Sequence, residues 1–137
     1  MTPGHKAQHT AKWARTMTKW LITFNRRKGV KWNLVEFGGK TKSEARGIVD
    51  ILAIRKNHRT DVNGLKRGDL FDIVLIQTKG GGARPPTDDD IARLIRVARH
   101  YKARDVVLAE WKKGTKPVFS RLLRKSWKET PAGEIFD

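Results

Sequence analysis

The stretch that decides the fold is Asp72-Ile-Val-Leu-Ile-Gln-Thr-Lys-Gly-Gly-Gly, residues 72–82. It predicts a buried β-strand that ends in polar side chains and then breaks on three glycines. Side chains alternate along a strand, so its residues divide into two sets. One face carries Ile73, Leu75, Gln77 and Lys79. The opposite face carries Val74, Ile76 and Thr78. An amide and an ammonium at the end of a buried face need polar partners.

A second apolar run, residues 47–54, supplies a partner because it contains one carboxylate, Asp50. We predict a strand over residues 46–56. If the two strands are neighbours, Asp50, Gln77 and Lys79 meet at one point. A carboxylate, a carbonyl oxygen and an ammonium are the groups that a metal-dependent phosphodiesterase requires. The structural alternative is a buried salt bridge between Asp50 and Lys79.

The length and composition indicate one folded domain over residues 1–137. The chain has 137 residues, of which 38% are hydrophobic, and no cysteine. No apolar run approaches the roughly 18 residues that a membrane span needs. The N-terminus lacks the apolar segment of a secretory signal. These features predict a cytoplasmic protein that has no disulfides and does not enter a membrane.

Charge is the strongest feature of the composition. Thirty Lys and Arg residues against fourteen acids give a formal net charge of +16. Such an excess predicts a polyanionic partner, because phosphate contacts release condensed counterions. We therefore expect a nucleic acid as the partner. The alternative is a basic surface that serves solubility or ribosome association.

The periodicity along the chain predicts a helix, three strands, a second helix and a fourth strand. The predicted ranges are 6–27, 30–37, 46–56, 70–79, 87–102 and 105–111. Residues 57–68 form a connector with an Asn63-Gly64 turn, and residues 80–86 form either a mobile flap or a plain linker. Residues 117–123 fit a short strand or a helical turn, and the tail after residue 123 stays open. This order predicts an α/β fold with a mixed four-stranded sheet flanked by helices.

Two helical features carry specific expectations. The first helix presents an apolar stripe, which we expect to pack in the core, with base stacking as the alternative. The stripe consists of Trp13, Met17, Trp20, Leu21 and Phe24. In the second helix, Thr87 is the expected N-cap, and Asp88, Asp89 and Asp90 suit the positive helix end better than a metal site.

The element order, with Gly-Ile-Val-Asp50 on the second strand and Ile-Gln77-Thr-Lys79 ending the third, resembles the PD-(D/E)xK nuclease superfamily. The resemblance covers about residues 10–111 and is closest to small Holliday-junction-resolvase-like and VRR-type members. It implies a restriction-endonuclease-like αβββαβ core. By position, Asp50 matches the metal-binding Asp and Lys79 the catalytic Lys. Gln77 stands where the family usually has Glu or Asp, and Val49 stands where it has Pro.

The resemblance implies a catalytic set of Asp50, Gln77, Lys79 and Glu44, with Mg²⁺ or Mn²⁺ held by Asp50, Gln77 and Glu44. Many members add an acid from the first helix, and the predicted helix here has none. Glu44 is the first choice for that acid and Glu36 is the second.

The function that follows is metal-dependent hydrolysis of phosphodiester bonds in structured or branched DNA. The expected phosphate-binding residues are Arg26, Arg27, Lys40, Lys42, Arg46 and Arg84. We expect DNA rather than RNA as the partner, and a homodimer would suit a symmetric substrate. One alternative is a non-catalytic DNA- or RNA-binding protein on a degenerate nuclease fold, with Gln77 as the mark of decay. Another is a ribosomal or RNA-processing protein.

Overall fold

The computed structural model describes residues 3–24, 31–37, 47–58 and 63–137, and the side chains from residue 10 onward within these ranges. Its elements follow the order α1 (Pro3–Phe24), β1 (Asn33–Glu36), β2 (Ile51–Lys56), β3 (Phe71–Gly80), α3 (Asp88–Tyr101), β4 (Asp105–Trp111), β5 (Val118–Leu123), β6 (Ser126–Glu129) and α4 (Ala132–Ile135). The strands form one six-stranded sheet in sequence order.

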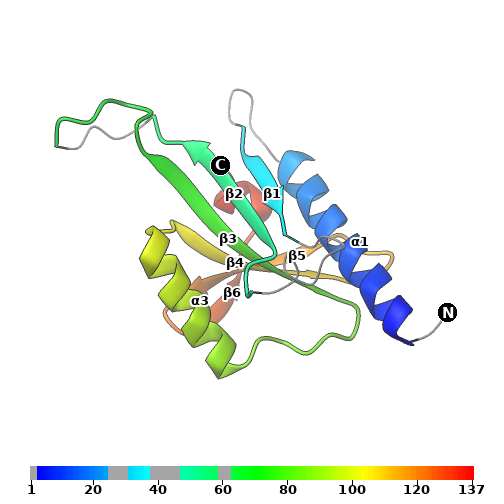
Figure 1. The fold of residues 1–137 in the computed structure, drawn as a ribbon. Coiled ribbons are helices and arrows are strands. Elements are labelled where there is room, and N and C mark those ends of the chain that lie inside the picture. Colours follow the sequence, from blue (N-terminus) through cyan, green and yellow to red (C-terminus); the bar gives the residue numbers. More distant parts are fainter. Residues whose placement is uncertain (1–2, 25–30, 38–46, 59–62) are drawn as a thin grey trace.

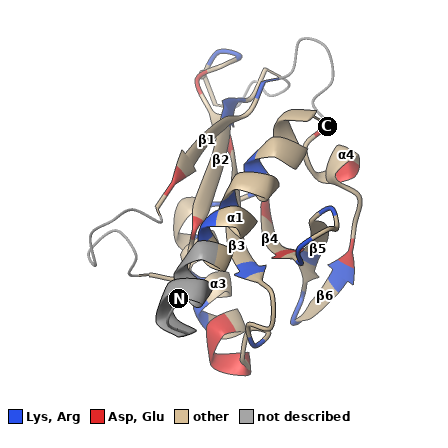
Figure 2. Ribbon diagram, turned by 90° about the vertical axis from the view of Figure 1, so that its right-hand side faces the viewer, with Lys and Arg blue, Asp and Glu red and all other residues tan. Residues whose placement is uncertain are grey.

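The sheet is mixed, because β3 and β4 are parallel and all other neighbours are antiparallel. Helix α3 makes the crossover between the parallel pair, as such a connection requires. Helices α1 and α3 lie on opposite faces of the sheet (Figures 1 and 2). The central strands are apolar on both faces because a helix covers each face.

The predicted α/β class and mixed sheet are confirmed, but the predicted four strands are wrong. Strands β5 and β6 extend the sheet beyond β4, with Leu122 paired to Trp127 across their hairpin. Their turn, Arg124-Lys125, carries no glycine or asparagine, so it gave no turn signal. Phe119, Ile135 and Phe136 belong to the same apolar cluster as Ile22 and Ile51. The core therefore continues past residue 111, where the family resemblance ends.

Helix α1 contacts the sheet through a face that includes Leu21 of the predicted stripe but not its large aromatic residues. Ala14, Thr18 and Ile22 are almost fully buried, and Leu21 is buried beside them. Of the predicted stripe, Trp13, Trp20 and Phe24 are 45%, 44% and 66% exposed, so the expectation that they pack in the core is wrong. Trp20 and Phe24 instead stack on each other, with ring centroids 5.2 Å apart.

The close approach of α1 to β3 explains this rotation. A Cβ at Gly80 would lie 3.0 Å from the Thr10 carbonyl oxygen and 3.2 Å from the Ala14 Cβ. Only small side chains fit between elements this close, so the bulky aromatic residues take the flank of the helix. Thr18 fits because its hydroxyl donates to the Ala14 carbonyl oxygen at 2.7 Å, which satisfies its polar group.

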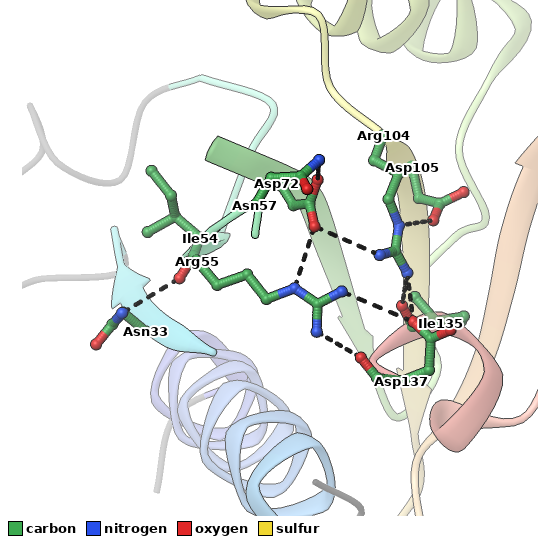
Figure 3. Close-up of polar contacts among 9 residues, drawn as sticks. All are labelled: Asn33, Ile54, Arg55, Asn57, Asp72, Arg104, Asp105, Ile135 and Asp137. Atoms are coloured by element: carbon green, nitrogen blue, oxygen red, sulfur yellow. Dashed lines mark hydrogen bonds and ion pairs between the residues drawn. The ribbon is translucent and has the colours of Figure 1, made fainter. Parts of the chain in front are cut away.

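The last residues of the chain are bound to the sheet through two arginines (Figure 3). Arg55 Nε lies 3.1 Å from Asp72 Oδ2, and Arg104 Nη2 lies 3.0 Å from Asp137 Oδ1. The same two guanidinium groups donate to the main-chain oxygens of Asp137 and Ile135. Both also lie over the ring of buried Trp32. This network fixes the segment after β6 against the start of β3 and β4.

Helix α3 begins as predicted. Thr87 accepts a hydrogen bond from the Asp90 amide, and the Asp90 carboxylate accepts one from the Thr87 amide. This reciprocal capping box holds the N-terminus of the helix, and the hydrogen bond from the Thr87 amide lowers the pKa of Asp90. The Asn63-Gly64 turn is also confirmed, because both residues have positive φ angles.

Candidate functional site

The candidate site lies where β2 begins and β3 ends, next to the glycines. Strand β2 starts at Ile51, later than the predicted residue 46, so Asp50 precedes the strand rather than lying within it. The Asp50 amide donates to the Ile76 carbonyl oxygen at 2.9 Å. Its Oδ2 accepts the Thr78 amide at 2.7 Å and the Thr78 hydroxyl at 3.2 Å. Asp50 thus bonds to the residues on either side of Gln77.

The hydrogen bonds show why Asp50 is placed there. The regular β2–β3 pairing runs from Lys56↔Phe71 to Ile51↔Ile76 and then stops. The carboxylate takes the place of the next main-chain acceptor and satisfies the Thr78 amide, which would otherwise lose its ladder partner. This gives Asp50 a defined orientation, and its second oxygen, Oδ1, accepts no hydrogen bond from the described residues.

Gln77 and Lys79 lie on the α3 side of β3, opposite the face that packs against α1. The register pairs Gln77 with Leu108 and Lys79 with Glu110 on β4. Gln77 is 7% exposed, and its Oε1 is buried without a hydrogen-bond partner among the residues that the structure describes. Buried amide oxygens nearly always accept a hydrogen bond, so we expect this atom to bind a hydrogen-bond donor or a cation.

Burial raises the pKa of Asp50 above its ordinary value, which makes its charged form costly. The two hydrogen bonds from Thr78 and the positive charges of Arg15 and Lys79 act in the opposite direction and only partly offset it. A carboxylate in this condition gains from a further cation. Asp50 and Lys79 make no ion pair in the described part of the chain, so the predicted alternative of a salt bridge between them is not what the structure contains.

Glu36, the second choice for the additional acid, is bound by two cations. Arg15 Nε lies 2.7 Å from its Oε1 and Lys19 Nζ lies 2.5 Å from its Oε2. Burial acts to raise the pKa of Glu36, but these hydrogen bonds outweigh it and the net pKa is lowered. This arrangement was not predicted, although Arg15 and Lys19 are four residues apart and share one side of a helix.

The other predicted site residues divide into two groups. Arg84 is exposed on the loop after β3. Outside the described residues lie Arg26, Arg27, Lys40, Lys42, Glu44 and Arg46. Within the described residues, no group of three His, Asp or Glu side chains is arranged to hold a metal ion. Of the three predicted metal ligands, Asp50 and Gln77 lie within the described residues.

A cleft of about 510 Å³ opens beside the end of β3. Thr10 and Ala11 of α1 form one side, and residues 78–83 form the other. Thr78, which hydrogen-bonds Asp50, and Lys79 therefore line this cleft. The glycines give this cleft a wall without side chains, along which another chain's backbone can approach closely.

No family model, no curated protein and no solved structure matches the chain. No helix in the described ranges has the length and apolar character needed to cross a bilayer.

Proposed function

We propose that this protein is a metal-dependent DNA endonuclease that hydrolyses phosphodiester bonds in structured or branched DNA, on a restriction-endonuclease-like fold. The observation that carries the proposal is the hydrogen bonding of Asp50 to Ile76 and Thr78, the two residues that flank Gln77. Asp50 has one carboxylate oxygen free of hydrogen bonds from Thr78, and Gln77 has a buried carbonyl oxygen with no partner in the described part of the chain. Hard cations such as Mg²⁺ and Mn²⁺ take oxygen ligands of this kind.

The proposal gives each of these residues a role. Asp50 and Gln77 would hold the ion, which supplies Lewis-acid polarisation of the phosphate and an activated water. Thr78 orients Asp50 through its amide and hydroxyl. Lys79 stabilises the negative charge that develops on the phosphate oxygens during attack. The sugar hydroxyl leaves as the phosphorus–oxygen bond breaks.

Glu44 stays the proposed third oxygen ligand. Glu36 is less suited, because Arg15 and Lys19 already neutralise it. Arg15 still contributes, since its positive charge lowers the pKa of Asp50 and so favours the ionised form that binds metal.

The partner is proposed from charge. The net charge of +16 suits the phosphate backbone of DNA, and a homodimer would place two sites on the two strands of a symmetric substrate. An RNA partner is the alternative within the same chemistry.

A second candidate function is non-catalytic nucleic-acid binding on the same fold. The observation that favours it is the neutral Gln77 in place of a carboxylate, which leaves Asp50 as the single acid of the described ligand pair. A neutral ligand weakens cation binding relative to a carboxylate.

Cleavage of labelled linear, forked and four-way DNA separates the two functions. We expect cutting in Mg²⁺ or Mn²⁺, none in EDTA, and none by Asp50→Ala or Lys79→Ala, while both variants still bind DNA. If the wild-type chain binds DNA but does not cut it in either metal, the non-catalytic alternative is supported. The same assay on RNA of matched structure tests the choice of DNA.

A further inference from the structure

A second basic feature lies on the α3 side of the sheet, at the end remote from Asp50. A cleft of about 220 Å³ is lined by three arginines, Arg99, Arg104 and Arg124, from the end of α3, the connection to β4 and the β5–β6 turn. Its remaining wall is mostly apolar, formed by Ile95, Ala98, Ala103, Val106 and Leu122. Residues distant in sequence thus converge on one small concave site.

The charge balance of this cleft is positive. Asp105 is its one acid, and it is bound by Arg104 at 3.3 Å and Arg121 at 3.1 Å. Arg104 also binds Asp72 and Asp137, so its charge is compensated within the fold. Arg99 and Arg124 make no ion pair with any residue that the structure describes. Two arginines that make no ion pair with the described residues therefore line one site.

The backbone conformation at Arg124 is an independent observation that indicates a role for its side chain. Arg124 has a φ of 59° in the two-residue turn between Leu123 and Ser126. Glycine adopts this conformation without steric cost, and an arginine does not. A long cationic side chain is thus held at a position where the turn alone favours glycine.

We infer that the Arg99–Arg124 cleft binds a sugar–phosphate unit of the nucleic acid that the Asp50 site acts on. Guanidinium groups bind phosphate oxygens in a bidentate manner, and the apolar wall suits the carbon face of a sugar. This inference rests on the proposed function for the identity of the partner. It adds a second anchoring point that positions the substrate.

The register gives the distance between the two sites. Lys79 pairs with Glu110, and Asp105 at the cleft lies five residues earlier on β4. At about 3.3 Å per residue, the cleft is roughly 17 Å from the end of β3 along the sheet. One DNA strand advances about 3.4 Å per nucleotide, so the cleft would meet a phosphate about five nucleotides from the one at Asp50.

The test measures DNA binding in EDTA, so that it is separate from cleavage. The variant is the double substitution Arg99→Gln and Arg124→Gly. Glutamine is a good helix former, and glycine relieves the positive φ, so thermal stability should be kept. The control is Lys56→Gln with Lys66→Gln, which removes the same charge from exposed positions at the β2–β3 connection.

We expect the cleft variant to bind forked DNA with ten-base-pair arms at least about tenfold more weakly near 0.1 M salt, with the slope of log affinity against log salt reduced by about two units. Forked DNA with three-base-pair arms cannot reach the cleft and should bind both proteins equally. If the cleft binds only the polymer, inorganic phosphate at the same salt should inhibit DNA binding by the wild type no more than it inhibits DNA binding by the variant.

Three results would overturn the inference: no loss of affinity, an equal loss in the lysine control, or an equal loss with short arms. Preferential competition by inorganic phosphate would show a free-anion site instead. The wild type could fail to cut DNA while the cleft variant still binds DNA more weakly than the wild type. That result would overturn the proposed function and leave this inference standing.

Discussion

At Asp50, burial and hydrogen bonding act on the same carboxylate in opposite directions, and burial is the larger influence on its pKa. A side chain kept only for structure would gain by being neutral in this environment. The charge is therefore the property that distinguishes a metal ligand from a structural cap, and substitutions that preserve shape while changing charge separate the two.

Asp50→Asn is expected to stabilise the metal-free protein at neutral pH. Because the pKa of Asp50 is raised on folding, the folded chain binds more protons than the unfolded chain between about pH 3.9 and the raised pKa. Protonation of Asp50 therefore adds its full contribution to the free energy of unfolding below that window. The contribution is lost as the pH rises through the window. Asparagine avoids the loss and still accepts the Thr78 amide.

Thermal unfolding in EDTA between about pH 4 and pH 8 measures this effect. The midpoint of Asp50→Asn should exceed that of the wild type at neutral pH, with the difference shrinking toward acid pH. Asp50→Ala, which also removes the acceptor for Thr78, is the control. A lower midpoint for Asp50→Asn at every pH would instead mean that the charge of Asp50 stabilises the fold.

Gln77→Met is expected to raise the free energy of unfolding in EDTA by about 1–3 kcal/mol. Methionine has a similar length and removes the buried carbonyl oxygen that has no partner. Stabilisation by Mn²⁺ should be lost in the same variant. Denaturant unfolding with and without Mn²⁺ measures both, and a destabilised variant in EDTA would show that the amide is satisfied in solution by another group.

At the scale of the elements, the close contact of α1 with β3 positions the cleft beside the site. Gly80 permits this contact, since a Cβ there would meet the Thr10 backbone at 3.0 Å. Gly82, two residues later, would place a Cβ in open space. The two glycines therefore offer a matched pair of substitutions.

Gly80→Ala is expected to lower the free energy of unfolding by about 1–3 kcal/mol, because α1 must shift to admit the methyl group. Gly82→Ala should change it by less than about 0.5 kcal/mol. Chemical denaturation of both variants tests the contact. Equal effects of the two substitutions would contradict the tight α1–β3 packing.

The elements also show what a sequence can and cannot predict. Long apolar runs and an explicit cap predicted β3, β4 and α3 to within a residue or two. The orientation of α1 could not be predicted, because Trp13 and Ala14 both lie on plausible stripes and the contact of Ala14 with Gly80 is between distant segments. Strand β6 was missed because its turn at Arg124 lacks the usual residues.

The candidate site was predictable in part for the same reason. Alternation along one strand placed Gln77 and Lys79 on one face. The bonds from Thr78 to Asp50 depend on where the β2–β3 ladder stops, and no local pattern encodes that point. The neutralisation of Glu36 by Arg15 and Lys19 depends on how α1 docks against β1.

At the scale of the whole molecule, two basic regions on one protein imply a substrate that is held along its length. The Asp50 site lies at one end of β3, and the Arg99–Arg124 cleft lies toward the other end on the α3 side. Between them the sheet keeps a fixed spacing, because β3 and β4 pair continuously from Val74↔Asp105 to Gly80↔Trp111. A rigid spacing suits a duplex arm better than a flexible single strand.

The measurement that tests the central claim most directly is single-turnover cleavage of four-way DNA over a range of Mg²⁺ concentrations, by the wild type, Asp50→Asn and Gln77→Glu. A metal held by Asp50 and Gln77 predicts no cleavage by Asp50→Asn and half-maximal cleavage by Gln77→Glu at a lower Mg²⁺ concentration than the wild type, because a carboxylate replaces a neutral ligand. Absence of cleavage by all three proteins, or the same Mg²⁺ dependence for the wild type and Gln77→Glu, would contradict a metal-dependent nuclease centre at these residues.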